Sequence, residues 1–210
     1  MRWIAAVLAL AACPTPSPCP GDEQMGSYTF RAEQQPTPDA SCPLAEVPDA
    51  SFEFTVKFCR FRDGGDAFAS IGGVPHPATW DGQKITASYS ARRSFSQCSC
   101  FTSPDPSTRQ LGTLIMTETI TATLLSKSQN DATGGDCSID PTVDADAGIT
   151  PPGSIEGGGF DAVRACGTLA ESTSVTPKPT VETDAEKTCR FECDTCSLSY
   201  AISGDRGDRR

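Results

Sequence analysis

The chain has 210 residues, and its 27 acidic side chains against 17 basic ones give a formal net charge of −10. A chain this acidic lacks the positive field that sequence-independent nucleic-acid binding requires, so we expect no nucleic-acid partner. Its length suits a single domain with its own hydrophobic core. The eleven cysteines make the cellular compartment decisive, because thiols pair in oxidising surroundings and stay reduced in the cytosol.

The first twelve residues have the organisation of a removable signal peptide. Arg2 supplies one positive charge, and an unbroken apolar run follows over residues 3–12. This run is much shorter than the roughly 20 residues that a membrane-spanning helix needs. We therefore predict a signal peptide over residues 1–12 and an exported protein.

The apolar run ends in Leu10-Ala11-Ala12-Cys13, which resembles the lipobox of bacterial lipoproteins. The resemblance implies that the Cys13 sulfur is diacylated, that the chain is cut before this residue and that the new amino group is acylated. Residues 13–26 would then be a lipidated cysteine and a proline-rich tether. The alternative is an ordinary signal peptide that happens to precede a cysteine.

The lipobox reading also predicts a location and partners. We expect a protein anchored in the bacterial cell envelope and facing the periplasm or the cell exterior. Its partners would be the membrane, through the N-terminal lipid, and an unknown envelope or extracellular ligand.

Ten cysteines remain once Cys13 is assigned to lipid, and an even number suits up to five disulfides in an exported chain. The disulfide candidates are Cys19, Cys42, Cys59, Cys98, Cys100, Cys137, Cys166, Cys189, Cys193 and Cys196. Their connectivity cannot be read from the sequence. The last three have a C-x3-C-x2-C spacing that resembles the iron–sulfur motif of radical S-adenosylmethionine enzymes. The α/β barrel that follows this motif in that family has no room here, so we expect no metal and no cofactor.

Strand signals dominate the middle of the chain. A short strand over Ser27–Arg31 precedes a clear one over Ser51–Phe58, in which large apolar residues alternate with polar ones. The Asp81-Gly82 pair predicts a tight hairpin turn. The strand that leaves this turn runs from Ile85 to Phe95, and Arg93 interrupts its apolar face.

The strongest strand signal covers Gly112–Leu125, where apolar residues alternate with a row of threonines. Glu118 is the odd member of the apolar face. A threonine face can present hydroxyl and methyl groups to ice or sugar, but one strand gives a line and not a plane. We interpret the row as solvent-facing residues with good strand propensity.

Residues 130–159 read as an irregular, acidic and glycine-rich loop. Asp144 and Asp146 suggest a calcium loop, but the third oxygen ligand of an EF-hand is missing. The following stretch, Phe160–Ala170, fits either a short helix or a strand. Two strands are expected over Lys187–Cys193 and Cys196–Ser203, before a charged tail over residues 205–210.

These elements predict a single β-rich domain over residues 27–204. The expected fold class is all-β, as a disulfide-stapled antiparallel β-sandwich or open barrel, because strand-period segments separated by turns dominate and no long amphipathic helix is present. Alternation with one polar face favours antiparallel pairing.

No convincing catalytic residue emerges from the sequence. His76, between Pro75 and Pro77, is expected in a surface loop without a catalytic role. We expect a binding or structural surface module. The alternative is an exported enzyme that uses carboxylates such as Glu118 or Asp161 for acid–base chemistry. Two interior carboxylates that converge in a cleft would favour the enzyme, whereas a flat apolar or aromatic patch would favour binding.

Overall fold

The computed structural model describes residues 19–36, 51–64, 66–101, 109–137, 144–156, 159–177, 190–191 and 196–207, with side chains for all of these but 91–101, 109–114, 175–177, 190–191 and 196. Nine strands and one short helix make up this part of the chain. The elements are β1 (Glu23–Gln34), β2 (Ser51–Arg60), β3 (Ala67–Ile71), β4 (Val74–Trp80), β5 (Lys84–Phe101), β6 (Arg109–Leu125), α1 (Lys127–Thr133), β7 (Arg164–Pro177), β8 (Arg190–Phe191) and β9 (Cys196–Arg206).

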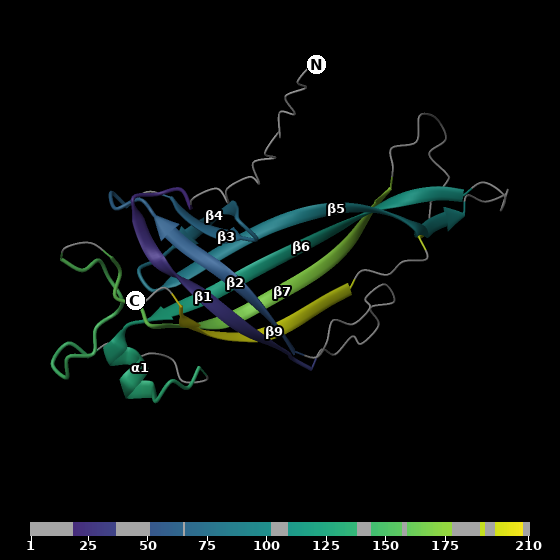
Figure 1. Ribbon diagram of the computed structural model, residues 1–210. Coiled ribbons are helices and arrows are strands. Elements are labelled where there is room, and N and C mark those ends of the chain that lie inside the picture. The colour runs from purple at the N-terminus through teal and green to yellow at the C-terminus, as the bar shows by residue number, and fades with distance from the viewer. Residues whose placement is uncertain are drawn as a thin grey trace, which may run out of the picture.

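The strands form one antiparallel sheet that closes into an eight-stranded barrel (Figure 1). Strands β1 to β7 pair in sequence order, β9 pairs with both β7 and β1, and β4 pairs with β5. The short β8 pairs with β5 outside this ring. The predicted all-β, antiparallel and disulfide-stapled fold class is confirmed, and the barrel is closed, which removes the open edges of the sheet.

The barrel interior is filled with side chains from alternate positions of each strand. Large fully buried side chains include Tyr28, Phe30 and Phe58, and alanines such as Ala69 and Ala87 face them across the interior. An eight-stranded barrel leaves just enough room for such side chains, and mixing large and small residues fills it. Burying each aromatic ring contributes about 1.5–3 kcal/mol.

One end of the barrel is closed by an ion pair and aromatic rings. Glu23 is buried, and its carboxylate accepts a hydrogen bond from the Arg60 guanidinium at 2.6 Å. The same guanidinium lies over the rings of Trp80 and Phe160, at 5.9 and 5.3 Å from their centroids. The phenylalanine carbonyl also accepts a hydrogen bond from Arg206 at 2.5 Å. We call this the closed end.

The opposite end of the barrel, which we call the mouth, lies where β4 begins and β1 ends. Strands β5 and β6 run well past it as a long ribbon (Figure 1). Strand β7 accompanies them as far as the pairing of Gly112 with Pro177. The inner face of these strands is therefore continuous from the packed core to the mouth.

Glycine allows two of these strands to approach closely. A Cβ atom at Gly167 of β7 would lie 1.9 Å from the Thr121 carbonyl oxygen of β6. No side chain fits there, so this close approach of β6 and β7 requires glycine.

Several sequence predictions need correction in detail. Of the Phe160–Ala170 stretch, for which the sequence allows either a helix or a strand, residues from Arg164 onward form the start of β7. The region predicted as an irregular loop begins inside α1, which Ser126 caps in a capping box with Gln129. Asp205 and Arg206, expected in a charged tail, belong to β9. Among the described residues, no helix has the length and apolar character to cross a membrane.

Candidate functional site

A row of five inward positions crosses the barrel at its mouth, one residue from each of five neighbouring strands. Glu118 of β6 is paired in register with Tyr89 of β5 and with Glu171 of β7. Glu171 is paired in turn with Leu198 of β9. His76 of β4 completes the row, because its ring stacks on Tyr89 with 4.4 Å between centroids. We call these five residues the mouth row.

Their inward orientation follows from strand parity. Side chains two residues apart lie on the same face of a strand. On β6, Ile120 and Ala122 are buried in the core, so Glu118 shares their face. Ile85 and Ala87 place Tyr89 on the same face of β5. The mouth row thus lies next to the hydrophobic core on the same inner face, and all of its members but Leu198 carry polar groups.

Glu118 and Glu171 are directly opposite each other on adjacent strands, and both are half-buried. Burial, together with the charge of Glu171, raises the pKa of the Glu118 carboxyl. Burial likewise raises the pKa of Glu171. Like charges at directly opposite positions destabilise a sheet, and no described basic side chain forms an ion pair with either carboxylate.

Two tyrosines are associated with this carboxylate pair. The Tyr89 hydroxyl donates a hydrogen bond to Oε2 of Glu118. Tyr200 lies one inward position deeper on β9, is fully buried, and packs edge-on against Phe52 with 5.2 Å between centroids. Burial and the nearby charge of Glu171 raise the pKa of Tyr200. The Tyr200 hydroxyl has no hydrogen-bond partner among the described residues.

The prediction for His76 is wrong in its location. The residue lies in β4 and faces the barrel interior, because it is paired in register with the buried Ala69 of β3. Strands β3 and β4 are joined by a turn at Gly72 and Gly73. Both glycines have positive φ, at 57° and 83°, as a tight hairpin turn requires. Within the mouth row the imidazole stacks on Tyr89 and contributes a flat aromatic surface.

The two carboxylates named from the sequence are not brought together. Asp161 precedes β7, whose first residue, Arg164, pairs with Leu125 of β6. That pair lies seven residues along β6 from Glu118, or about 23 Å at the usual strand rise. The partner of Glu118 is Glu171, which sequence reasoning missed. The signal was available, since Ala165, Leu169 and Glu171 share one parity once this segment is read as a strand.

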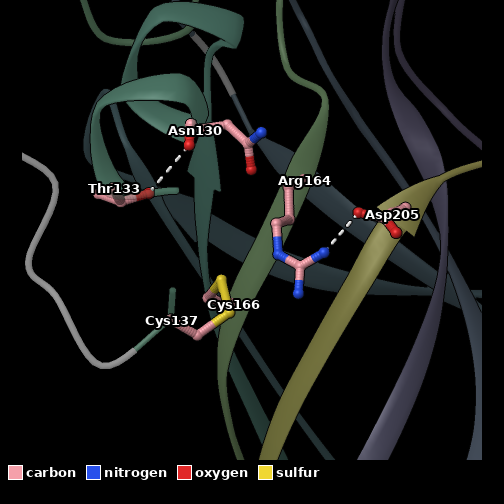
Figure 2. The surroundings of a disulfide bond; sticks show 6 residues. All are labelled: Asn130, Thr133, Cys137, Arg164, Cys166 and Asp205. Carbon is pink, nitrogen blue, oxygen red and sulfur yellow. Dashed lines mark hydrogen bonds and ion pairs between the residues drawn. A yellow bond between two sulfur atoms is a disulfide. The ribbon is translucent and has the colours of Figure 1, made fainter. Parts of the chain in front are cut away.

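Two of the predicted disulfides lie within the described residues. Cys19 is bonded to Cys59 at the end of β2. Cys137, just after α1, is bonded to Cys166 of β7 (Figure 2). The other six disulfide candidates and Cys13 lie outside the described residues or have side chains outside them.

The disulfide between Cys137 and Cys166 lies beside a hollow on the outer face of the barrel. Its volume is about 530 Å³. Threonine and serine side chains line much of it, together with the charged residues Arg31, Glu33 and Lys84. Figure 2 shows Arg164 of β7 nearby, and its guanidinium donates a hydrogen bond to Asp205 of β9 at 2.6 Å. The hollow and the mouth row lie on opposite faces of the same strands.

The threonine row of β6 has hydroxyl-bearing neighbours on the outer face. The Thr117 and Thr119 hydroxyls are hydrogen-bonded to Ser90 and Ser88 of β5, at 2.9 and 3.0 Å. On the other side, Thr117 is paired in register with Ser172 of β7. The row is therefore part of a broader hydroxyl surface, which sequence reasoning treated as a single line.

Metal binding finds no support among the described side chains. No three His, Cys, Asp or Glu residues in this part of the chain are grouped so that they could hold a metal ion. The Asp144 carboxylate instead accepts hydrogen bonds from the backbone amides of Asp146 and Ala147, as in a capped turn.

Comparison with protein-family models, with curated proteins and with solved structures finds no match for this chain. The chemistry of the mouth row must therefore be argued from its own groups. A pair of carboxylates with raised pKa values can hold a proton between them or attract a cation. An aromatic surface and an unpaired phenol lie beside them.

Proposed function

We propose that the protein is a lipid-anchored component of the bacterial cell envelope that acts as a binding module, with the mouth row as its binding site. The lipobox resemblance at Cys13 supports the anchor. Disulfides persist in oxidising compartments, so the bonds at Cys19–Cys59 and Cys137–Cys166 support export.

The observation that carries the binding site is the inward carboxylate pair of Glu118 and Glu171 at the mouth of the barrel, next to its hydrophobic core. Repulsion between the two groups and their partial burial both cost stability. Polar groups that a fold places at such a cost are candidates for binding or catalysis. A ligand that complements them would remove part of that cost.

Binding is favoured over catalysis by the surroundings of the pair. The interior beneath the mouth row is filled by Tyr200, Phe30 and other core side chains. The described hollow of about 530 Å³ lies on the outer face, away from both carboxylates. An active site encloses the substrate in a cleft beside the reacting groups, and this hollow does not lie beside the carboxylates.

A second candidate function is an exported enzyme that uses Glu118 and Glu171 as acid and base. The convergence of two interior carboxylates with raised pKa values is the observation that favours it. An enzyme acting on a diffusing substrate does not depend on where it is tethered. Binding to a membrane-confined partner does depend on tethering, because anchoring raises the effective concentration.

The test separates anchor from site. Cells expressing the full chain are labelled with radioactive fatty acid, and the label is expected in the wild type and not in Cys13→Ser. Labelling that survives the substitution contradicts the lipid anchor. A strain with residues 14–210 behind a non-lipoprotein signal is then compared with wild type at matched amounts of folded protein. If the protein binds a membrane-confined partner, the untethered form should bind that partner weakly in cells. If the untethered form retains the full function of the tethered protein, the enzyme alternative is supported.

A further inference from the structure

We propose that the mouth row binds a primary ammonium group, held by the carboxylates of Glu118 and Glu171 and by the hydroxyl of Tyr200. This inference rests on the proposed function, because it assigns a ligand class to the same site.

The charge of the ligand follows from the carboxylate pair. Glu118 and Glu171 face each other across adjacent strands without a described basic partner. A cation between them would turn a repulsive pair into two attractive contacts, and partial burial strengthens such contacts relative to water. An anion would add a third negative charge, and a neutral group would leave the repulsion unchanged.

The hydrogen-bonding capacity of the site points to a primary amine among organic cations. An –NH₃⁺ group has three donors and no acceptor. The site offers two carboxylates and the Tyr200 hydroxyl, which is buried, unpaired and close enough to Glu171 to be influenced by its charge. Tyr89 already donates to Glu118 and so leaves the remaining carboxylate oxygens as acceptors. The three donors of the ammonium group therefore have three acceptors.

The walls of the site suit the carbon chain that carries the ammonium group. The stacked rings of His76 and Tyr89 form a flat aromatic surface beside the carboxylates. Aromatic faces attract cations and pack against methylene groups. A free alkylamine and a lysine side chain share this chemistry, and the experiment below treats them as separate arms.

Ligand binding would be coupled to protonation of the pair. Among the described side chains, the titratable groups that face the site are Glu118, Glu171, Tyr89, Tyr200 and His76, one from each of the five strands of the mouth row. Arg93 lies four residues beyond Tyr89 on β5 and is paired in register with Leu114. Because an ammonium group favours the ionised carboxylates, its affinity is expected to rise with pH through their raised pKa values.

The experiment is an NMR titration of the mature chain carrying Cys13→Ser and ¹³C-labelled glutamate carboxyl groups. The probes are n-butylammonium, the lysine model Nα-acetyl-lysine N-methylamide, butyltrimethylammonium and 1-butanol. We expect both primary amines to shift the Glu118 and Glu171 signals and to lower their titration midpoints. Butyltrimethylammonium, which has the charge without donors, should bind at least tenfold more weakly, because it cannot form any of the charge-assisted hydrogen bonds that the primary amine forms.

Variants identify the groups that hold the ammonium. Tyr200→Phe should weaken n-butylammonium roughly tenfold and leave butyltrimethylammonium unchanged. It should fold at least as well as wild type, because it removes a buried hydroxyl without a partner. Glu118→Gln and Glu171→Gln should each weaken both cations at least tenfold. The exposed Glu53→Gln on the outer face is the matched control and should change nothing.

The outcomes separate the ligand class from the proposed function. Equal binding of 1-butanol and n-butylammonium at the mouth row would overturn the ammonium assignment and leave the binding module intact. No shift of the Glu118 or Glu171 signals with any probe would overturn both. A marked rise of their titration midpoints in Arg93→Gln would show that an internal cation already neutralises the pair, and would also overturn the ammonium assignment.

Discussion

Removing the disulfide between Cys19 and Cys59 should cost more stability than a typical single substitution on the surface of the barrel. The bond joins residues 40 apart in the sequence and holds Cys19, which precedes β1, at the end of β2. Loop closure over 40 residues corresponds to an entropy loss of ~13 cal/mol/K in the unfolded chain, or ~3.9 kcal/mol at about 25 °C. Both cysteines are buried, so alanine at both positions removes the bond with little new polar burial.

The assay is urea unfolding of the mature chain carrying Cys13→Ser, with and without Cys19→Ala and Cys59→Ala. Trp80 is the sole tryptophan after residue 12 and packs against Phe160, so its fluorescence reports the barrel. We expect the midpoint to fall by roughly 1.5 M, for a slope of about 2.5 kcal/mol/M.

The disulfide between Cys137 and Cys166 gives a matched comparison. It spans 29 residues, for which the same relation predicts about 3.6 kcal/mol. The two double-alanine variants should therefore lose similar stability. A loss below about 1 kcal/mol for the Cys19–Cys59 variant would refute the reasoning, because the cross-link would then not restrict the unfolded chain.

Two further predictions concern ionisable groups at the two ends of the barrel. Because the pKa values of Glu118 and Glu171 are raised in the folded state, that state binds protons more tightly than the unfolded chain, and stability falls as pH rises from the ordinary value of 4.5 through the raised values. Glu171→Gln should therefore be more stable than wild type at about pH 8 and indistinguishable at about pH 4 in urea unfolding, and an equal gap at both values would contradict this. At the closed end, Arg60→Ala leaves Glu23 buried without its 2.6 Å partner and should cost about 3 kcal/mol by thermal unfolding. Arg62→Ala removes a half-exposed arginine 3.6 Å from the same carboxylate and should cost under about 1 kcal/mol, so equal losses would contradict the assigned roles.

The strands of the barrel could be predicted where apolar and polar residues alternate over many positions, so that one face of the strand is apolar. The Ser51–Phe58 segment and the Gly112–Leu125 segment are both strands, and the Asp81-Gly82 pair lies in the turn between β4 and β5. Closure could not be predicted, because it depends on the pairing of β1 with β9 between distant parts of the chain. Alternation specifies which face is buried and not which strands pair.

Only part of the candidate site could be predicted from the sequence, for a related reason. Glu118 stood out because it interrupts an apolar face. Glu171 did not, because its segment carries serine and threonine at neighbouring positions and its periodicity is ambiguous. His76 was misplaced because the prolines on both sides suggest a loop, whereas proline is tolerated in this strand at positions Pro75 and Pro77. Only the register of the sheet brings these residues into one row.

If the protein is lipid-anchored as we propose, the position of Cys19 gives the barrel a direction relative to the membrane. If Cys13 carries the lipid, six residues separate the bilayer surface from the disulfide, a reach of at most about 20 Å even when fully extended. Cys59 is paired with Gln24 at the closed end, so that end is held against the bilayer and the mouth row points away from it. The lipid headgroups of its own membrane would then lie beyond the reach of the mouth row.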